Sequence, residues 1–236
     1  FKGGDRTNIE LPKVQRNFLK ALKEAGKKVV FVNCSGSAIA LTPETESCDA
    51  ILQAWYPGQE GGEAVARVLF GEYNPAGKLP ITFYKNSEQL PDFKDYSMKG
   101  RTYRYMKNEA LYPFGYGLSY TKFELGDAKL TVRENGTVDV SVSIQNVGGR
   151  EGAEVLQAYV KVEKDETPNP QLKAFRKVHL LPGEKKNVTL TLNQNAFTLV
   201  NQQGERIDER KHCVIYVGTS QPDACSAVLT GQHPQK

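Results

Sequence analysis

Two short polar stretches carry the side chains best suited to chemistry, and each follows an apolar run. The first is NCSGS at 33–37, and the second is YPGQEGG at 56–62. Glu60 in the second stretch is of a type that can act as a general acid or base. It also stands just before a segment predicted to be helical, where a negative charge interacts favourably with the positive end of the helix dipole. That structural role accounts for the residue, so we do not assign catalysis to Glu60.

The NCSGS stretch lacks the pattern of a nucleophile elbow. That pattern, G-x-S-x-G, requires a glycine two residues before the nucleophile, and none stands there for Cys34 or Ser35. A serine or cysteine nucleophile also needs a base nearby, whereas His179, His212 and His233 all lie far along the chain. We therefore expect a tight turn at the carboxyl end of a strand, the edge at which open α/β sheets bind ligands.

Trp55 and Tyr56 place two large aromatic rings at the end of the second apolar run. Such rings either stack on a ligand such as a sugar ring or pack together as a buried pair at the sheet edge. The sequence leaves both alternatives open.

The elements that position these residues have the order of an α/β domain. Residues 27–33 and 49–56 are predicted to be short strands covered on both faces, because they show no alternation. A helix is predicted before them and a shorter one over 63–70. A further strand is expected within 71–84, and the whole implies a mostly parallel sheet of which about half is present. The apolar face of the first helix is predicted to comprise Leu11, Val14, Phe18, Ala21, Leu22 and Ala25.

The hydrophobic period changes to two after Lys122. Apolar and polar residues alternate over 138–145, 156–162 and 188–192, with glycine- or proline-containing turns between the runs. Seven or eight short strands at this spacing predict an all-β sandwich of the immunoglobulin or fibronectin type III kind.

A long segment with little periodicity separates the two halves. It is too aromatic to be disordered, and loops of this length are usually functional. We expect it to lie against both halves and to fix their relative position. The predicted division is therefore 1–86 for the α/β part, 87–121 for the aromatic connector and 122–236 for the sandwich.

Composition excludes several classes of protein. The 236 residues carry a net charge of only +4, and scattered lysines and arginines give no electrostatic footprint for nucleic-acid binding. No apolar run is long enough to cross a bilayer. No cysteine pair has the C-x-x-C spacing of a zinc site, and we expect no metal and no cofactor. Cys213 and Cys225 flank a predicted turn, and either a disulfide or two buried thiols fits that arrangement.

Several motifs resemble glycoside hydrolase family 3, in the order in which that family has them. Residues 3–22 resemble the segment after its acid/base loop, and 54–83 (AWYPGQEGGEAVARVLFGEYNPAGKLPITF) resemble its second domain. LYPFGYGLSYTKF at 111–123 is similar to the link into its fibronectin-like third domain, which 149–162 and 172–192 resemble in turn. GRTYRYM at 100–106 is more similar to the β-xylosidase-like branch than to typical β-glucosidases.

The resemblance implies retaining hydrolysis of a terminal β-linked xylose or glucose from an oligosaccharide. In the family, an N-terminal barrel carries an aspartate nucleophile and a glutamate shortly before the Gly-Asp-Arg motif acts as acid/base. Such carboxyl pairs stand about 5–5.5 Å apart. We therefore expect no catalytic residue in this chain and both carboxyls upstream of it, so that the chain alone is inactive. Asp5, Arg6 and Arg101 are expected at the rim of the substrate cleft. The alternative for Asp5 and Arg6 is a structural ion pair that holds the entry of the chain.

The same resemblance implies that the chain is the C-terminal part of a longer, secreted or periplasmic protein. Its expected partners are the oligosaccharide and the missing barrel, with no nucleic acid and no membrane. Arg101, Tyr103 and Arg104 are expected to contact either the substrate or that barrel, and we prefer docking against the barrel because aromatics and arginine are enriched in interface cores. The alternative is a non-catalytic carbohydrate-binding or scaffold module, since a fold does not fix a function.

Overall fold

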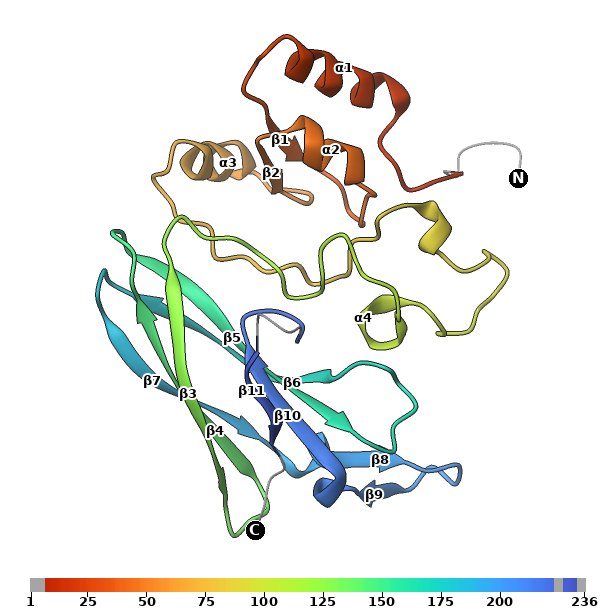
Figure 1. Cartoon of the computed structure of the whole chain (residues 1–236), viewed down its shortest axis with the longest axis vertical. Helices are drawn as coiled ribbons and strands as arrows, with labels where there is room; N and C mark the ends of the chain where they lie inside the picture. Colours follow the sequence, from red (N-terminus) through yellow and green to blue (C-terminus); the bar gives the residue numbers. More distant parts are fainter. Residues whose placement is uncertain (1–6, 223–226, 233–236) are drawn as a thin grey trace.

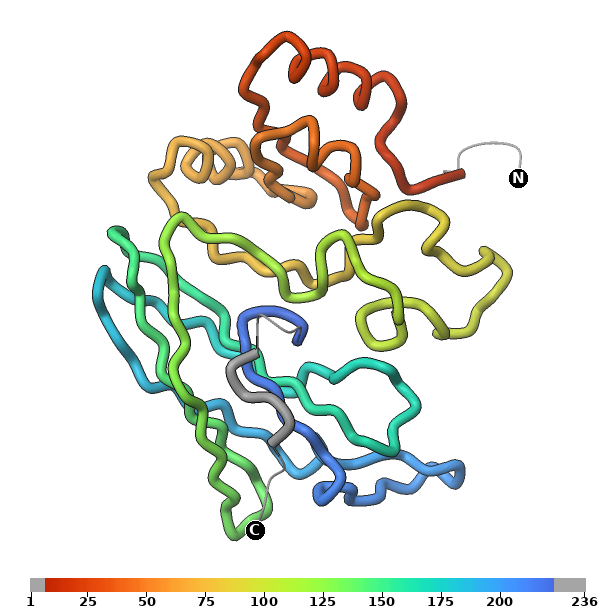
Figure 2. Tube along the Cα trace, in the orientation of Figure 1, coloured from red at the N-terminus to blue at the C-terminus, as the bar shows by residue number. Residues whose placement is uncertain are grey.

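The computed structural model describes residues 7–222 and 227–232, which form an α/β part and a β-sandwich with an aromatic connector between them (Figure 1). Figure 2 follows the path of the chain by colour: the α/β part comes first, the yellow and light-green segment then runs along the boundary, and the sandwich follows. The prediction of a partial α/β part followed by an all-β sandwich is confirmed.

The α/β part is built around two parallel strands. Its elements are α1 (Lys13–Glu24), β1 (Val30–Asn33), α2 (Thr42–Ser47), β2 (Ala50–Gln53) and α3 (Gly61–Leu69). β1 pairs with β2 in register from Val30 opposite Ala50 to Asn33 opposite Gln53. Their core comprises Leu11, Leu19, Val29, Ile39, Leu41, Cys48 and Phe83.

The predicted apolar face of α1 is only partly correct. Leu19 is buried, and Leu22 packs against the core from the same side of the helix. The neighbouring stripe is exposed, with Val14 at 74% and Phe18 at 63%. Residues three, four or seven apart lie on the same face of a helix, whereas adjacent residues do not. The apolar residues of α1 therefore form two stripes, and only the stripe with Leu19 and Leu22 packs against the core. The exposed stripe comprises Val14, Phe18, Ala21 and Ala25.

Two further elements differ from the sequence prediction. The helix α2, which has proline in its first turn, was not predicted. The segment 71–84, expected to be a strand, does not join the sheet of β1 and β2. Its Phe83 forms only an isolated antiparallel bridge with Tyr112. Leu79 likewise exchanges backbone hydrogen bonds with Gly115 and Tyr116, each of 2.8 Å. Pro80 cannot donate to a ladder, and the segment pairs instead with the connector.

The sandwich consists of two antiparallel sheets and a small hairpin. One sheet has the order β11-β10-β5-β6, the other β3-β4-β7, and β8 pairs with β9. The strands are β3 (Phe123–Val132), β4 (Val138–Asn146), β5 (Gly152–Val162), β6 (Gln171–Leu180), β7 (Lys185–Leu192), β8 (Thr198–Val200), β9 (Arg206–Asp208), β10 (Cys213–Gly218) and β11 (Ala227–Gln232). Short 3-10 turns are η1 (Ser87–Gln89) in the connector, and η2 (Gln194–Phe197) and η3 (Arg210–His212) in the sandwich. The alternating residues predicted to face inward, such as Val140, Ile144 and Leu156, form its buried core.

Strand β5 is buried on both faces, because the connector covers its outer side. Tyr103 stacks on Phe114 with ring centroids 4.2 Å apart, and both rings meet Tyr159 of β5 edge-on. Tyr103 belongs to α4 (Thr102–Tyr105), a single helical turn in the connector. The Tyr159 hydroxyl donates to Gln157 Oε1 at 2.6 Å, and Gln157 Nε2 donates to the carbonyls of Gly115 and Thr219.

A buried ion pair fastens the two parts together beneath the connector. Lys78 Nζ lies 2.7 Å from Glu154 Oε1, and both side chains are about nine-tenths buried. The same ammonium donates to the Gly117 carbonyl at 3.0 Å. Nearby, Asn74 accepts from the Tyr120 backbone N–H at 2.8 Å and donates to the Glu151 carbonyl at 3.3 Å. The connector therefore contacts both parts, as predicted.

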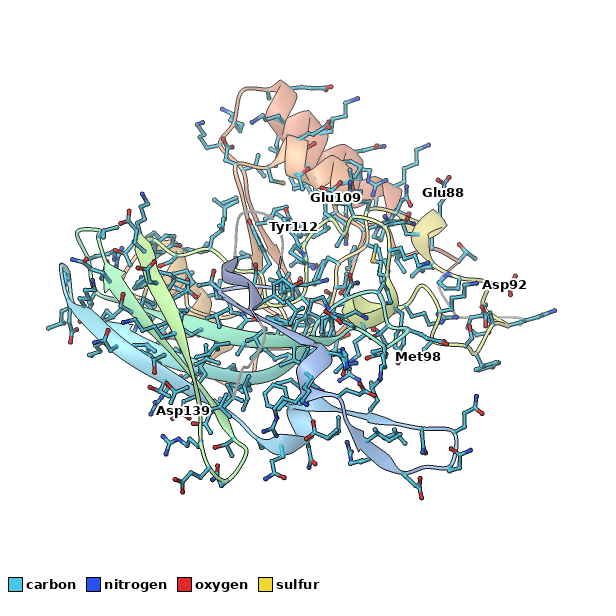
Figure 3. The ribbon with its side chains drawn as sticks, turned by 60° about the horizontal axis from the view of Figure 1, so that its bottom comes forward. Glu88, Asp92, Met98, Glu109, Tyr112 and Asp139 are labelled. Carbon is cyan, nitrogen blue, oxygen red and sulfur yellow. The ribbon has the colours of Figure 1, made fainter. Side chains whose placement is uncertain are left out.

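The end of the sandwich remote from the connector has its own fixed charge pair (Figure 3). Asp139 accepts hydrogen bonds from Arg133 and from the Thr191 hydroxyl. Those hydrogen bonds, with Arg133 first, hold the pKa of Asp139 below its ordinary value of 3.8.

Candidate functional site

The loop after β1 is held by a network of buried polar groups. The Asn33 amide donates to the Ser35 hydroxyl at 3.0 Å and to Gln53 Oε1 at 2.6 Å. The Ser35 hydroxyl donates to the Ser37 carbonyl at 2.9 Å. The stretch is thus a turn at the carboxyl end of a parallel strand, where α/β sheets place ligand sites. The Ser35 hydroxyl donates its proton to a backbone carbonyl and not to a base. His179 and His212 lie in β6 and η3 of the sandwich, so neither serves as a base for Ser35.

Trp55 and Tyr56 do not form a buried pair. Trp55 has φ of 57°, a left-handed conformation that is costly outside glycine, and its ring meets Phe83 edge-on at 6.2 Å. Tyr56 is 79% exposed, and its ring lies over Gly36, where an added Cβ would be 2.4 Å from the ring. The strained backbone therefore turns one ring into the core and leaves the other available at the strand edge.

Glu60 occupies the N-cap position of α3 and its side chain makes no capping hydrogen bond. The residue is exposed. Its position at the positive end of the helix dipole is the one predicted from the sequence.

The first described residues of the chain are anchored to the start of the connector, and no sequence motif predicts this contact. Ser87 donates its backbone N–H to Glu10 Oε1 at 3.0 Å and its hydroxyl to the same carboxylate. Ile9 in turn donates its N–H to the Ser87 hydroxyl at 3.1 Å. Burial acts to raise the pKa of Glu10, but the Ser87 hydrogen bonds outweigh it and the pKa is lowered. The pairing spans 77 residues, and neither residue belongs to a motif.

A shallow hollow of about 580 Å³ opens beside this anchor, lined by Asn8, Glu10, Leu11, Pro12, Lys13, Arg16 and Asn17. Arg16 Nε lies 2.8 Å from Glu44 Oε1, and the Glu44 side chain is almost fully buried. Arg16 Nη2 and Glu44 Oε2 are buried without a hydrogen-bond partner in the part of the chain that the structure describes. Such groups are costly to leave unsatisfied.

Arg101 shapes a loop of the connector, residues 92–101, which we call the connector loop. Its guanidinium donates to three backbone carbonyls, those of Ser97 at 3.1 Å, Asp92 at 3.3 Å and Asp95 at 2.5 Å. Figure 3 shows this loop, marked by Asp92 and Met98, projecting to one side of the molecule.

Tyr103 has a partner different from the one predicted. Its hydroxyl accepts from the Leu172 backbone N–H at 3.1 Å, and its carbonyl accepts from the Asn169 amide at 2.7 Å. The ring therefore packs against the sandwich of this chain and is half-buried there. Arg104 lies with its guanidinium carbon 5.9 Å from the Tyr103 ring centroid.

Some predicted residues lie outside the described residues: Asp5, Arg6, Cys225 and His233. Within the described part, Cys213 is fully buried in β10. No group of three or more potential metal ligands occurs among the residues described. Across the same residues, no helix is long and apolar enough to cross a membrane.

Comparisons with known proteins bear on this arrangement. A family model described as the glycosyl hydrolase family 3 C-terminal domain matches residues 2–120, and one for a fibronectin type III-like domain matches 154–221. A xylan 1,4-beta-xylosidase of Xylanibacter ruminicola is 55% identical over 98% of this chain. A periplasmic beta-glucosidase of Salmonella typhimurium is 41% identical over 92% of it.

The crystal structure of DesR, a beta-glucosidase from Streptomyces venezuelae in complex with D-glucose, superposes with a TM-score of 0.86 at 28% identity and covers 98% of this chain. The chain spans only 27% and 31% of the lengths of the two relatives and 32% of the length of DesR.

Proposed function

Because this chain belongs to glycoside hydrolase family 3, we propose that it is the C-terminal portion of a retaining, exo-acting β-glycosidase. The enzyme would release terminal β-linked xylose or glucose from oligosaccharides. The observation that carries the proposal is the 55% identity, over 98% of this chain, to a xylan 1,4-beta-xylosidase. The second relative, a periplasmic beta-glucosidase, keeps glucose open as the preferred sugar.

The two catalytic carboxyls belong to parts of the enzyme outside this chain, and the chain alone is inactive. Three carboxylates of the α/β part are already engaged: Glu10 with Ser87, Glu44 with Arg16, and Asp49 with the Val29 backbone N–H at 2.9 Å. Groups held in this way by local partners are poor candidates for a carboxyl pair that must face a sugar from both sides.

The division into 1–86, 87–121 and 122–236 remains our proposal for the parts of the chain, and an N-terminal barrel is the partner of the first. One feature supports further protein against the α/β part: the α1 stripe around Val14 and Phe18 is exposed and apolar. Asp5, Arg6 and Arg101 lie at the rim of the cleft that barrel and chain enclose.

We place the enzyme outside the cytoplasm, in the periplasm or secreted. The name of the second relative supports this location.

The test compares the longer gene product with the 236-residue chain, using aryl β-xylosides and aryl β-glucosides. We expect the longer protein to hydrolyse at least one of them and the chain to hydrolyse neither. Turnover by the purified chain would place catalytic groups within it. A longer protein that binds saccharide but hydrolyses nothing would favour the non-catalytic carbohydrate-binding module.

A further inference from the structure

The connector loop carries two aromatic rings that the fold leaves uncovered. Phe93 is 84% exposed and Tyr96 is 89% exposed. Single exposed apolar residues are common on protein surfaces, but here two full rings stand three residues apart on one projecting loop. Neither is among the ring contacts found between described residues.

The loop that presents these rings is held in one shape by its own hydrogen bonds. The Asp92 carboxylate accepts from the Lys94 backbone N–H, and the Asp95 carboxylate accepts from the Ser97 backbone N–H, each at 2.8 Å. Phe93 and Tyr96 are the middle residues of these two turns, and the Arg101 guanidinium closes the loop by donating to three carbonyls. A ligand bound by such a loop loses little free energy to ordering it.

The position of the loop places it beside the incoming chain. Glu10 and Ile9 hydrogen bond to Ser87, five residues before the loop begins. Figure 1 shows the loop on the side of the molecule where the described chain starts. In the proposed function the acid/base carboxyl precedes this chain, so in that proposal the side on which the chain enters is the leaving-group side of the substrate.

We propose that Phe93 and Tyr96 form a stacking platform for a pyranose ring of the substrate, on its leaving-group side. This inference rests on the proposed function. An aromatic face packs against the C–H groups of a sugar ring. The platform thus favours oligosaccharides over glycosides with no second ring.

The experiment uses the longer enzyme with Phe93→Ala or Tyr96→Ala, and Phe70→Ala as the matched control. Phe70 is also 84% exposed but lies at the end of α3. The substrates are xylotetraose and methyl β-xyloside, or the glucose equivalents. We expect each loop variant to lower kcat/KM about tenfold for the tetraose and less than twofold for the methyl glycoside. Phe70→Ala should change the ratio of kcat/KM for the tetraose to kcat/KM for the methyl glycoside by less than twofold.

Equal losses on both substrates would overturn the platform and indicate that the loop docks against protein. No loss on either would also overturn it. A wild-type enzyme that cleaves neither substrate would instead refute the proposed function. In that case the stacking platform is tested by a binding measurement, affinity electrophoresis of the 236-residue chain in gels that contain soluble xylan. Retardation that Phe93→Ala abolishes and Phe70→Ala preserves supports it, and retardation that is absent or insensitive to Phe93→Ala overturns it.

Discussion

Gly115→Ala is expected to weaken the attachment of the connector to the sandwich. Gly115 has φ of +79°, and an added Cβ would stand 2.3 Å from Gln157 Oε1. Two costs therefore combine. The left-handed backbone costs roughly 1–2 kcal/mol for a residue with a Cβ, and overpacking a filled site typically costs about 1–3 kcal/mol. We expect a total loss of about 2–5 kcal/mol in the free energy of unfolding.

Gly204→Ala is the matched control for this change. Gly204 has φ of +81° with nothing within 4 Å of the added Cβ, so it reports the backbone cost alone, roughly 1–2 kcal/mol. The difference between the two variants isolates the contact with Gln157. A double variant, Gly115→Ala with Gln157→Ala, removes the clash and should lose less than the sum of its single variants.

The assay is urea unfolding of the 236-residue chain, followed by far-ultraviolet circular dichroism. The midpoint for Gly115→Ala should fall clearly below that for Gly204→Ala, with similar slopes. Equal midpoints for the two variants, or strict additivity in the double variant, would refute the reasoning, since both outcomes mean that Gln157 yields to the new methyl group without cost.

Three further changes test other parts of the structure. Lys78→Met should destabilise the chain by about 3–5 kcal/mol, because it leaves the Glu154 carboxylate buried without its partner; thermal unfolding measures it. Asp139 has a lowered pKa in the folded state, so its pairing stabilises the fold above about pH 4 and is lost as pH falls through the lowered pKa; Asp139→Asn should flatten the decline in stability as pH falls below about 4. Cys34 is exposed and should react with a thiol reagent in the native protein. Cys213 should react only on unfolding, because burial raises its pKa to about 12; mass spectrometry of labelled peptides distinguishes the two.

Each of these has an outcome that contradicts it. Lys186→Met removes an exposed pair with Glu184 and should cost less than about 1 kcal/mol; a Lys78→Met loss as small as that would mean that the buried pair contributes little. Parallel pH profiles for wild type and Asp139→Asn would deny the linkage. Native labelling of Cys213 at the rate of Cys34 would deny its burial.

The sandwich could be predicted closely from the sequence because its information is local. Val140 and Ile144 face inward and their neighbours do not, and a period of two sets this register by itself. The α/β part was less predictable. The period of α1 fits two stripes equally well, and only packing decides that Leu19 is buried and Phe18 is not.

The candidate site depends on contacts between residues far apart in the sequence, and no sequence motif predicts these contacts. The Glu10–Ser87 anchor crosses 77 residues. The sequence predicts that Tyr103 docks outside the chain, whereas in the structure its ring packs edge-on against Tyr159. The turn after β1 could be predicted, because polar residues that follow a buried strand have few other options.

The double burial of β5 sets limits on how this protein can be recombined with others. A sandwich transplanted without residues 87–121 would leave the ring of Tyr159 and the amide of Gln157 bare on an outer sheet face. Chimeras between relatives should therefore be joined before residue 87 and not after residue 121, so that the sandwich is always transferred together with its own aromatic cover.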